Sequence, residues 1–329
     1  MTDAVRALVT GAAGQDGTYL LDRLLADGVE VHGMVHSLAS ADSLVGRFPG
    51  VEFHVADIAD SQSVASLVSE VKPTSIYNLA GITSVAKSWE SPIETGDVLG
   101  IGPLRLLEAA WREFEKSGGP VHLLQASSAE MFGDAAETPQ RETTNRRPVS
   151  PYGAAKSFAH EMVNVYRARG MHASTAILYN HESPRRPESF VARKVALAAA
   201  RISLGLQETV TLGNIDVSRD WGYAPDYVDA MVRISAQPLP GDFIVATGES
   251  HTVRDFVGEA FAVAGVTDWA DRVLIDPALY RPADPRSLVG DPSALRSIGW
   301  QPSISFHELV RIMVTAELDA LSSGDEVVR

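Results

Sequence analysis

Short apolar runs alternate with longer segments of helical periodicity over the first half of the chain. The runs predict strands at 6–10, 29–35, 51–56, 75–79, 121–126 and 173–178. Apolar residues at helical spacing predict helices at 19–27, 61–71, 92–116 and from about 152 onward. Strands separated by helices are typical of an α/β fold with a doubly wound parallel sheet. Prolines accumulate after Tyr179, which predicts a second, smaller and mainly C-terminal lobe.

Charge and composition exclude several classes of protein. The 329 residues carry 28 Lys and Arg against 42 Asp and Glu, a net charge of −14, so we expect no general binding to nucleic acid or anionic membranes. The chain has no cysteine, which excludes disulfides, thiolate zinc sites, iron–sulfur clusters and a cysteine nucleophile. This composition is compatible with a cytoplasmic location. The longest apolar stretch, near 195–204, contains Arg201 and is too short to cross a bilayer.

A glycine-rich turn, TGAAGQDG, lies between the first predicted strand and the first predicted helix. Glycines let the backbone approach a pyrophosphate, and a helix N-terminus offers N–H groups and a favourable dipole. In this context the turn predicts a Rossmann domain that binds a dinucleotide. The second strand ends before His36 and Ser37, without the acid that would repel a 2′-phosphate. The sequence therefore favours NADP, although no arginine stands there and NAD remains an alternative.

A second group of candidate residues follows two later strands. Tyr152 and Lys156 lie one helical turn apart, and an ammonium near a phenol favours the phenolate and lowers its pKa. Ser127, Ser128 and Glu130 follow the strand at 121–126, at the sheet edge where ligands of open α/β sheets bind. A serine hydroxyl there can bond a reacting oxygen, and Glu130 can act as a base. We expect no metal site.

These stretches resemble the GDP-mannose 4,6-dehydratase family, within the extended short-chain dehydrogenase/reductase superfamily. The resemblance runs from about Arg6 to Ala316, and its most specific segments are GQDG, NHESPRR and GN-x₄-RDWG. It implies a nucleotide-sugar 4,6-dehydratase that converts GDP-mannose to GDP-4-keto-6-deoxy-mannose. It also implies a dinucleotide-binding domain at 1–178 with a returning segment near 211–248. A nucleotide-sugar-binding lobe would then comprise 179–210 and 249–329.

The resemblance implies a role for each matching residue. Tyr152 would be the base at the C4 hydroxyl, Lys156 would hold the ribose and tune Tyr152, and Ser128 would bond O4. Glu130 would remove the C5 proton, and shielding from water would raise its pKa toward neutrality. The implied cofactor contacts are Thr10, Gly11, Gly14, Gln15, Asp16, Gly17, His36, Asp57, Ile58, Leu79, Ala80, Gly81, Tyr152, Lys156, His181 and Arg186. The implied substrate contacts are Thr83, Ser84, Ser128, Glu130, Asn180, Val191, Lys194, Arg219 and Arg281.

The sequence departs from the family pattern at three places. Only a short connection follows the second strand, where the family usually has two arginines and a long loop that reaches a neighbouring subunit. Ile82, Thr83 and Ser84 replace the family's Gln-Ser-His near the sugar. Ala129 stands where the family often has Ser and where glucose-type dehydratases have Asp, so Glu130 or water would protonate the departing hydroxyl.

These departures leave alternatives. A 4-ketoreductase or an epimerase on the same scaffold is the second interpretation, and a non-catalytic nucleotide-binding subunit is the third. The two long helices near 92–116 and 152–168 often pair across a two-fold axis in this superfamily. They therefore predict a homodimer, with a homotetramer as the alternative.

Overall fold

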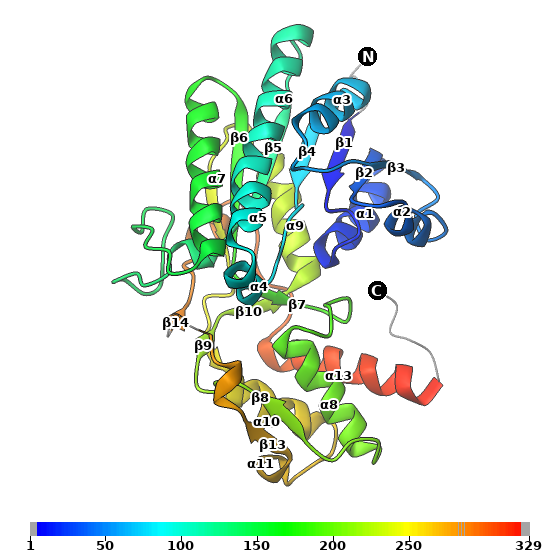
Figure 1. Cartoon of the computed structure of the whole chain (residues 1–329), viewed down its shortest axis with the longest axis vertical. Coiled ribbons are helices and arrows are strands. Elements are labelled where there is room, and N and C mark those ends of the chain that lie inside the picture. Colours follow the sequence, from blue (N-terminus) through cyan, green and yellow to red (C-terminus); the bar gives the residue numbers. More distant parts are fainter. Residues whose placement is uncertain (1–4, 282, 284, 286, 324–329) are drawn as a thin grey trace.

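The computed structural model describes residues 5–281, 283, 285 and 287–323 and shows a larger body joined to a smaller one (Figure 1). The larger body contains a seven-stranded sheet of order β11-β6-β5-β4-β1-β2-β3, in which all neighbouring strands are parallel. This order confirms the doubly wound fold. The strands are β1 (Arg6–Thr10), β2 (Glu30–Val35), β3 (Val51–Val55), β4 (Ser75–Asn78), β5 (His122–Ser128), β6 (His172–Leu178) and β11 (Asp242–Val245).

Helices cover both faces of this sheet. One face packs against α1 (Gln15–Ala26), α2 (Leu38–Val45) and α9 (Ala224–Ser235) through one apolar cluster. The other face packs against α3 (Ser61–Val71), α6 (Gly102–Ser117) and α7 (Pro151–Ala168) through a second cluster. Burial of both faces explains why the strands appear as nearly continuous apolar runs in the sequence.

The structure differs from the sequence-based prediction in three elements. The short connection after β2 contains α2, whose N-cap Ser37 accepts a hydrogen bond from the backbone of Ser40. The helix expected at 92–116 is divided into α5 (Pro92–Gly96), a π-helical turn (Asp97–Ile101) and α6. β5 continues to Ser128, so the two serines expected after the strand form its last residues.

The smaller body has its own apolar core. It is built on α8 (Val191–Ser203), α10 (Val253–Val263) and α13 (Phe306–Ser323), together with β8 (Val210–Leu212) and β13 (Val273–Ile275), which pair in parallel. The remaining elements are α4 (Val85–Glu90), β7 (Asn180–Glu182), β9 (Ser218–Arg219), β10 (Trp221–Tyr223), β12 (His251–Thr252), α11 (Trp269–Arg272), β14 (Ser287–Leu288) and α12 (Ser293–Ser297). None of the described helices is long and apolar enough to cross a membrane.

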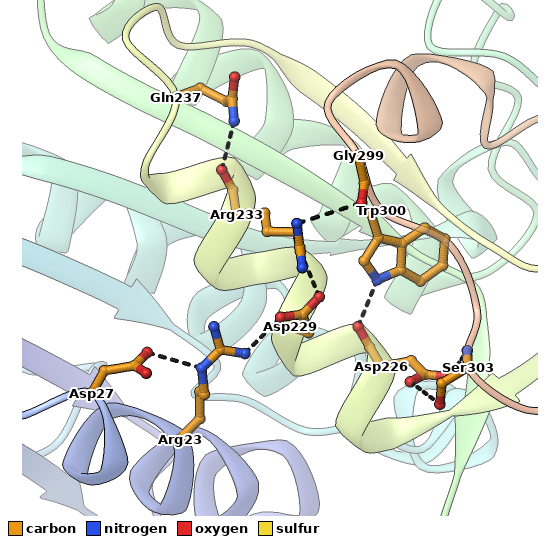
Figure 2. A network of polar contacts seen from close by, with 9 residues as sticks. All are labelled: Arg23, Asp27, Asp226, Asp229, Arg233, Gln237, Gly299, Trp300 and Ser303. Carbon is orange, nitrogen blue, oxygen red and sulfur yellow. Dashed lines mark hydrogen bonds and ion pairs between the residues drawn. The ribbon is translucent and has the colours of Figure 1, made fainter.

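Polar contacts along α9 tie the C-terminal part of the chain to the larger body (Figure 2). Arg23 of α1 donates to Asp229 of α9 over 2.6 Å. Three residues earlier on the same helix, Asp226 accepts a hydrogen bond from the Ser303 hydroxyl at 2.6 Å, and its backbone carbonyl accepts from the Trp300 indole at 2.9 Å. α9 is therefore held both by α1 and by the chain that leads to α13.

Candidate active site

The glycine turn between β1 and α1 leaves no room for side chains at two positions. Gly11 has a φ of +67°, and a Cβ there would lie 2.8 Å from the backbone of Leu79. A Cβ at Gly17 would lie 2.3 Å from the carbonyl oxygen of Gly11. Gly14 is the N-cap of α1 and makes no side-chain cap hydrogen bond. The compact turn thus exposes the N-terminal end of α1 to an anion, which fits a dinucleotide pyrophosphate.

A buried chain of hydrogen bonds runs from this turn across the sheet. The Thr10 hydroxyl donates to Asn78 Oδ1 at 2.6 Å and accepts from the backbone N–H groups of Leu79 and Ala80. Asn78 donates to Gln125 Oε1 at 2.7 Å. Gln125 in turn donates to the Ala126 carbonyl at 2.8 Å. Thr10 therefore links the end of β1 to the end of β4, and its hydroxyl proton is donated to Asn78.

The chain of hydrogen bonds ends at Lys156. Lys156 Nζ donates to the same Ala126 carbonyl at 2.9 Å and lies 5.9 Å from the centre of the Tyr152 ring. Burial lowers the pKa of Lys156 to about 8 and raises the pKa of Tyr152 to about 12, although a hydrogen bond with Ser128 opposes the latter shift. The expectation of a lowered Tyr152 pKa is therefore wrong, because burial outweighs the opposing effects of the Ser128 hydrogen bond and the Arg186 charge.

Ser128 and Glu130 lie beside Tyr152 at the end of β5. The Ser128 hydroxyl accepts a hydrogen bond from the backbone N–H of Glu130 at 3.2 Å. The Glu130 side chain is only 12% exposed, and Nη1 of Arg281 lies 3.7 Å from its Oε1. A Cβ at Gly153 would lie 2.4 Å from the Glu130 carbonyl oxygen, so this glycine lets α7 approach the loop. The structure thus brings Tyr152 and Glu130, the two expected bases, together with Arg281.

The two specific segments GQDG and NHESPRR contact each other directly. Asp16 Oδ2 lies 2.8 Å from Nε2 of His181, and Nδ1 of His181 lies 2.7 Å from the Tyr179 carbonyl. The Ser183 hydroxyl donates to Gln15 Oε1 at 2.8 Å. Burial is the largest single effect and opposes ionisation of both Asp16 and His181, but their attraction, their hydrogen bond and those to neighbouring groups together outweigh it, so the pKa of Asp16 is lowered and that of His181 is raised.

Arg186 is held over an aromatic ring at the edge of this cluster. Its guanidinium carbon lies 3.7 Å from the centre of the Phe190 ring, and its Nε lies 3.1 Å from Oε2 of Glu182. Glu182 is fully buried, and burial raises its pKa even though Arg186 opposes the shift. The positive charge of Arg186 also opposes part of the rise in the pKa of Tyr152 that burial causes.

Several expected ligand contacts already have partners within the protein. Lys194 Nζ donates to the Thr211 carbonyl at 2.7 Å, and Arg219 donates to the Pro285 carbonyl at 2.9 Å. The Ser84 hydroxyl caps α4, where it accepts from the backbone of Lys87, and Thr83 is exposed. Asn180 begins β7 and Val191 begins α8, and both are half-buried. Lys194, Arg219 and Ser84 therefore each make a hydrogen bond within the protein.

The residues expected beside the cofactor follow the C-terminal ends of β2, β3 and β4. His36 is 83% exposed, and its Nε2 lies 3.9 Å from Asp57 Oδ2. Ile58 is buried against Gly102 of α6. Leu79, Ala80 and Gly81 follow β4, and the backbone of Gly81 has a φ of +147°. All of them belong to the sheet edge on which the glycine turn lies.

Sequence reasoning missed four residues that organise this site. Asn78 and Gln125 are each 1% exposed, and Glu182 and Ser183 are likewise buried. A polar amide at the end of an otherwise apolar strand was an available signal for the first two, because a buried amide requires partners. Arg186, the partner of Glu182, stands only four positions further on, whereas Gln15, the partner of Ser183, lies 168 positions away and could not be predicted by spacing.

Comparisons with known proteins agree with this geometry. A family described as "GDP-mannose 4,6 dehydratase" matches residues 8–313. The Arabidopsis thaliana protein named GDP-mannose 4,6 dehydratase 1 is 43% identical, with 95% of this chain and 90% of that protein covered. Among solved structures, the Thermus thermophilus UDP-glucose 4-epimerase complex with NAD has a TM-score of 0.82 at 31% identity, covering 94% of this chain and 98% of that one. RMD from Pseudomonas aeruginosa complexed with NADPH has a TM-score of 0.78 at 25% identity, covering 96% and 99%.

Proposed function

Because the chain belongs to the GDP-mannose 4,6-dehydratase family, we propose that it converts GDP-mannose to GDP-4-keto-6-deoxy-mannose with loss of one water. The single observation that carries this proposal is the position of Glu130. A carboxylate that is only 12% exposed lies beside Tyr152 and Ser128, where a second acid–base group can act on the same sugar. A ketoreductase needs a proton donor at O4 alone, whereas a dehydratase also needs a base at C5.

We propose the following division of roles. A bound nicotinamide would supply the hydride transfers, from C4 and back to C6. Tyr152 accepts the proton of the C4 hydroxyl while Ser128 bonds the same oxygen, and the Lys156 ammonium favours the phenolate. The C4 ketone makes the C5 proton acidic, and Glu130 removes it. Glu130 then protonates the C6 hydroxyl, which leaves as water.

The protons balance over the cycle. Tyr152 and Glu130 each accept one proton, from O4 and C5. The leaving hydroxyl takes one proton from Glu130. After the hydride has returned to C6, C5 takes one proton from solvent through Glu130. Tyr152 releases its proton to solvent, which completes the balance. Ala129 is 3% exposed and packs in an apolar cluster with Met131 and Phe132. Position 129 therefore supplies no proton, and Glu130 serves both steps.

We propose NADP as the cofactor. The glycine turn, Lys156, His181 and Arg186 would hold it, together with the residues that follow β2, β3 and β4. No acid follows directly on β2 to repel a 2′-phosphate; instead His36 and the N-terminus of α2 stand there. The diphosphate of the sugar nucleotide would lie against Arg281 and Arg219, whose guanidinium groups suit phosphate oxygens. Asn180, Val191, Lys194, Thr83 and Ser84 would line the rest of the substrate site.

We further propose that the two bodies bind different ligands, and that the protein forms a homodimer. Residues 1–178 together with α9 and β11 would bind the dinucleotide, whereas β8, which pairs with β13, belongs to the sugar-nucleotide lobe. The returning segment would then begin near Ala224, later than 211. Apolar side chains exposed on α5 and α7 would form the dimer contact; they include Ile93, Phe158 and Val165, which are 88%, 39% and 50% exposed.

The test is the reaction itself, followed by mass spectrometry with GDP-mannose and catalytic NADP⁺. The proposal predicts a product lighter by one water and no net formation of NADPH. Tyr152→Phe should abolish this product. Formation of an isomer without loss of water would favour an epimerase, and consumption of NADPH with a keto sugar would favour a ketoreductase.

A further inference from the structure

A histidine pair with two carboxylates lies on the edge of the sheet, away from the residues described above. His32 is on β2, and Glu52 and His54 are on the edge strand β3, where His32 and Glu52 are register partners. Nδ1 of His32 lies 3.0 Å from Nε2 of His54. Glu52 Oε2 lies 3.6 Å from His32 Nδ1, and Glu52 Oε1 lies 4.0 Å from His54 Nε2. Three potential ligand groups therefore converge on one point.

The spacing of these atoms fits a metal ion. Two imidazole nitrogens bound to one tetrahedral ion at about 2.0–2.1 Å each are about 3.3 Å apart, close to the observed separation. The His32 and His54 side chains are only 9% and 14% exposed, so their rings are held in place by the sheet. Glu52 is 67% exposed and can move to complete the coordination, with water as the fourth ligand.

A second carboxylate orients His32 for this purpose. Glu30 Oε1 lies 3.2 Å from Nε2 of His32, and Arg6 Nε donates to the same oxygen at 2.8 Å. A carboxylate only accepts, so Nε2 of His32 carries the proton and the lone pair of Nδ1 faces His54 and Glu52. A carboxylate on the distal nitrogen of a histidine is the usual support of a metal ligand.

We propose that His32, His54 and Glu52 form a binding site for a divalent transition-metal ion, best suited to Zn²⁺. Two imidazoles and one carboxylate are the ligand types that Zn²⁺ and Co²⁺ prefer, whereas Mg²⁺ and Ca²⁺ prefer oxygen. The strands β4, β1 and β2 separate β3 from β5, which leads to Ser128 and Glu130. The ion would therefore be structural, and it would fasten the edge strand β3 to β2.

This site could not be predicted from the sequence because its residues follow no recognised metal-binding spacing. His32 and His54 are 22 positions apart and meet only through strand pairing. The alternative is that no metal binds and that the two imidazole rings form a hydrogen bond with each other. The two possibilities differ in the role of Glu52, which a ring-to-ring hydrogen bond does not need.

The test is titration of the untagged full-length protein with Co²⁺, followed by its visible absorption and by calorimetry, with Zn²⁺ as competitor. We expect one ion per chain. His54→Gln should abolish binding, Glu52→Gln should weaken it at least about 10-fold, and Glu30→Gln should weaken it about 10–100-fold. His307→Gln is the matched control, because His307 is a surface histidine paired with a glutamate, and it should bind as the wild type does.

A second measurement separates loss of the site from loss of the fold. Zn²⁺ should raise the thermal unfolding midpoint of the wild type by at least about 2 °C and should raise that of Glu52→Gln by less at the same Zn²⁺ concentration. Glu52 is mostly exposed, so its replacement does not disturb packing. Wild type without saturable binding, or equal binding by wild type, His54→Gln and Glu52→Gln, would overturn the proposal.

Discussion

The Asp16 carboxylate lies 2.8 Å from Nε2 of His181, although 165 positions separate the two residues in the chain. Both ring nitrogens of His181 face acceptors, since Nδ1 lies 2.7 Å from the Tyr179 carbonyl. The ring therefore carries two protons and forms an ion pair with Asp16. This pair fastens the glycine turn that begins α1 to the segment that leads from β6 into the smaller body.

Loss of this pair should destabilise the protein. His181→Gln would leave Asp16 charged and buried without its partner, at a cost of about 3 kcal/mol in the free energy of unfolding. Because the pKa of His181 is raised above 6.5, its contribution is complete below pH 6.5 and declines as pH rises through the folded-state pKa. Urea unfolding of wild type and variant between pH 6 and 9 measures both effects. His307→Gln, which breaks a surface pair, should cost at most about 1 kcal/mol, and an equal loss in both variants would refute the prediction.

Glu130→Gln should stop water elimination while leaving the binding of GDP-mannose nearly unchanged. Removal of a positioned acid–base group typically lowers kcat by about 10²–10⁴-fold. In D₂O the wild type should place one solvent deuterium at C5 of the product, because Glu130 returns a solvent proton there. Glu137→Gln makes the same change at an exposed position of the following loop and should keep full activity. Full turnover by Glu130→Gln would show that another group removes the C5 proton.

Lys156 should make the stability of the protein without ligands rise with pH. Burial lowers the pKa of Lys156 from 10.5 to about 8, so the unfolded chain binds a proton that the folded chain releases between these values. This difference amounts to about 3 kcal/mol between pH 8 and 10.5. Lys156→Met should lack this part of the pH dependence. Parallel pH profiles of the unfolding free energy for both proteins would contradict the assignment of a depressed pKa.

Substitutions on the exposed face of α7 should separate the proposed homodimer. Phe158 and Val165 lie seven residues apart, about two turns, on α7. Phe158→Glu and Val165→Glu would each place a charge in a contact that must exclude water. Light scattering after size exclusion should give a dimer mass for the wild type and a monomer mass for the double variant. Leu206→Glu, at a 65% exposed apolar position after α8, should remain dimeric. A wild-type monomer would refute the proposal, and a tetramer would indicate a second interface.

Local patterns predicted the sheet because its strands are short apolar runs buried on both faces. They did not predict α2, a helix of eight residues that buries only Ala41 and Leu44 and is capped by Ser37. They also did not predict the interruption of the 92–116 helix. The π-helical turn there contains Gly100, which lets the chain approach α7. A Cβ at this position would lie 3.3 Å from the Phe158 ring.

Residue types predicted the members of the site more readily than their partners. Tyr152, Lys156, Ser128 and Glu130 meet as expected because helix α7 and strand β5 place them at one edge of the sheet. Lys194 instead donates to the Thr211 carbonyl and Arg219 to the Pro285 carbonyl, contacts that the residue types alone do not predict. The contact between Asp16 and His181 depends on the packing of β7 against the glycine turn and has no local signal.

Glu130 and Tyr152 are proposed to act together on one sugar, and the mass of the product tests this joint action. Wild-type protein with GDP-mannose and catalytic NADP⁺ should form a nucleotide sugar lighter by one water, without accumulation of NADPH. Tyr152→Phe and Glu130→Gln should both fail to form it. Unchanged GDP-mannose in the presence of wild-type protein, or loss of water that survives both substitutions, would show that Glu130 and Tyr152 do not act together in this way.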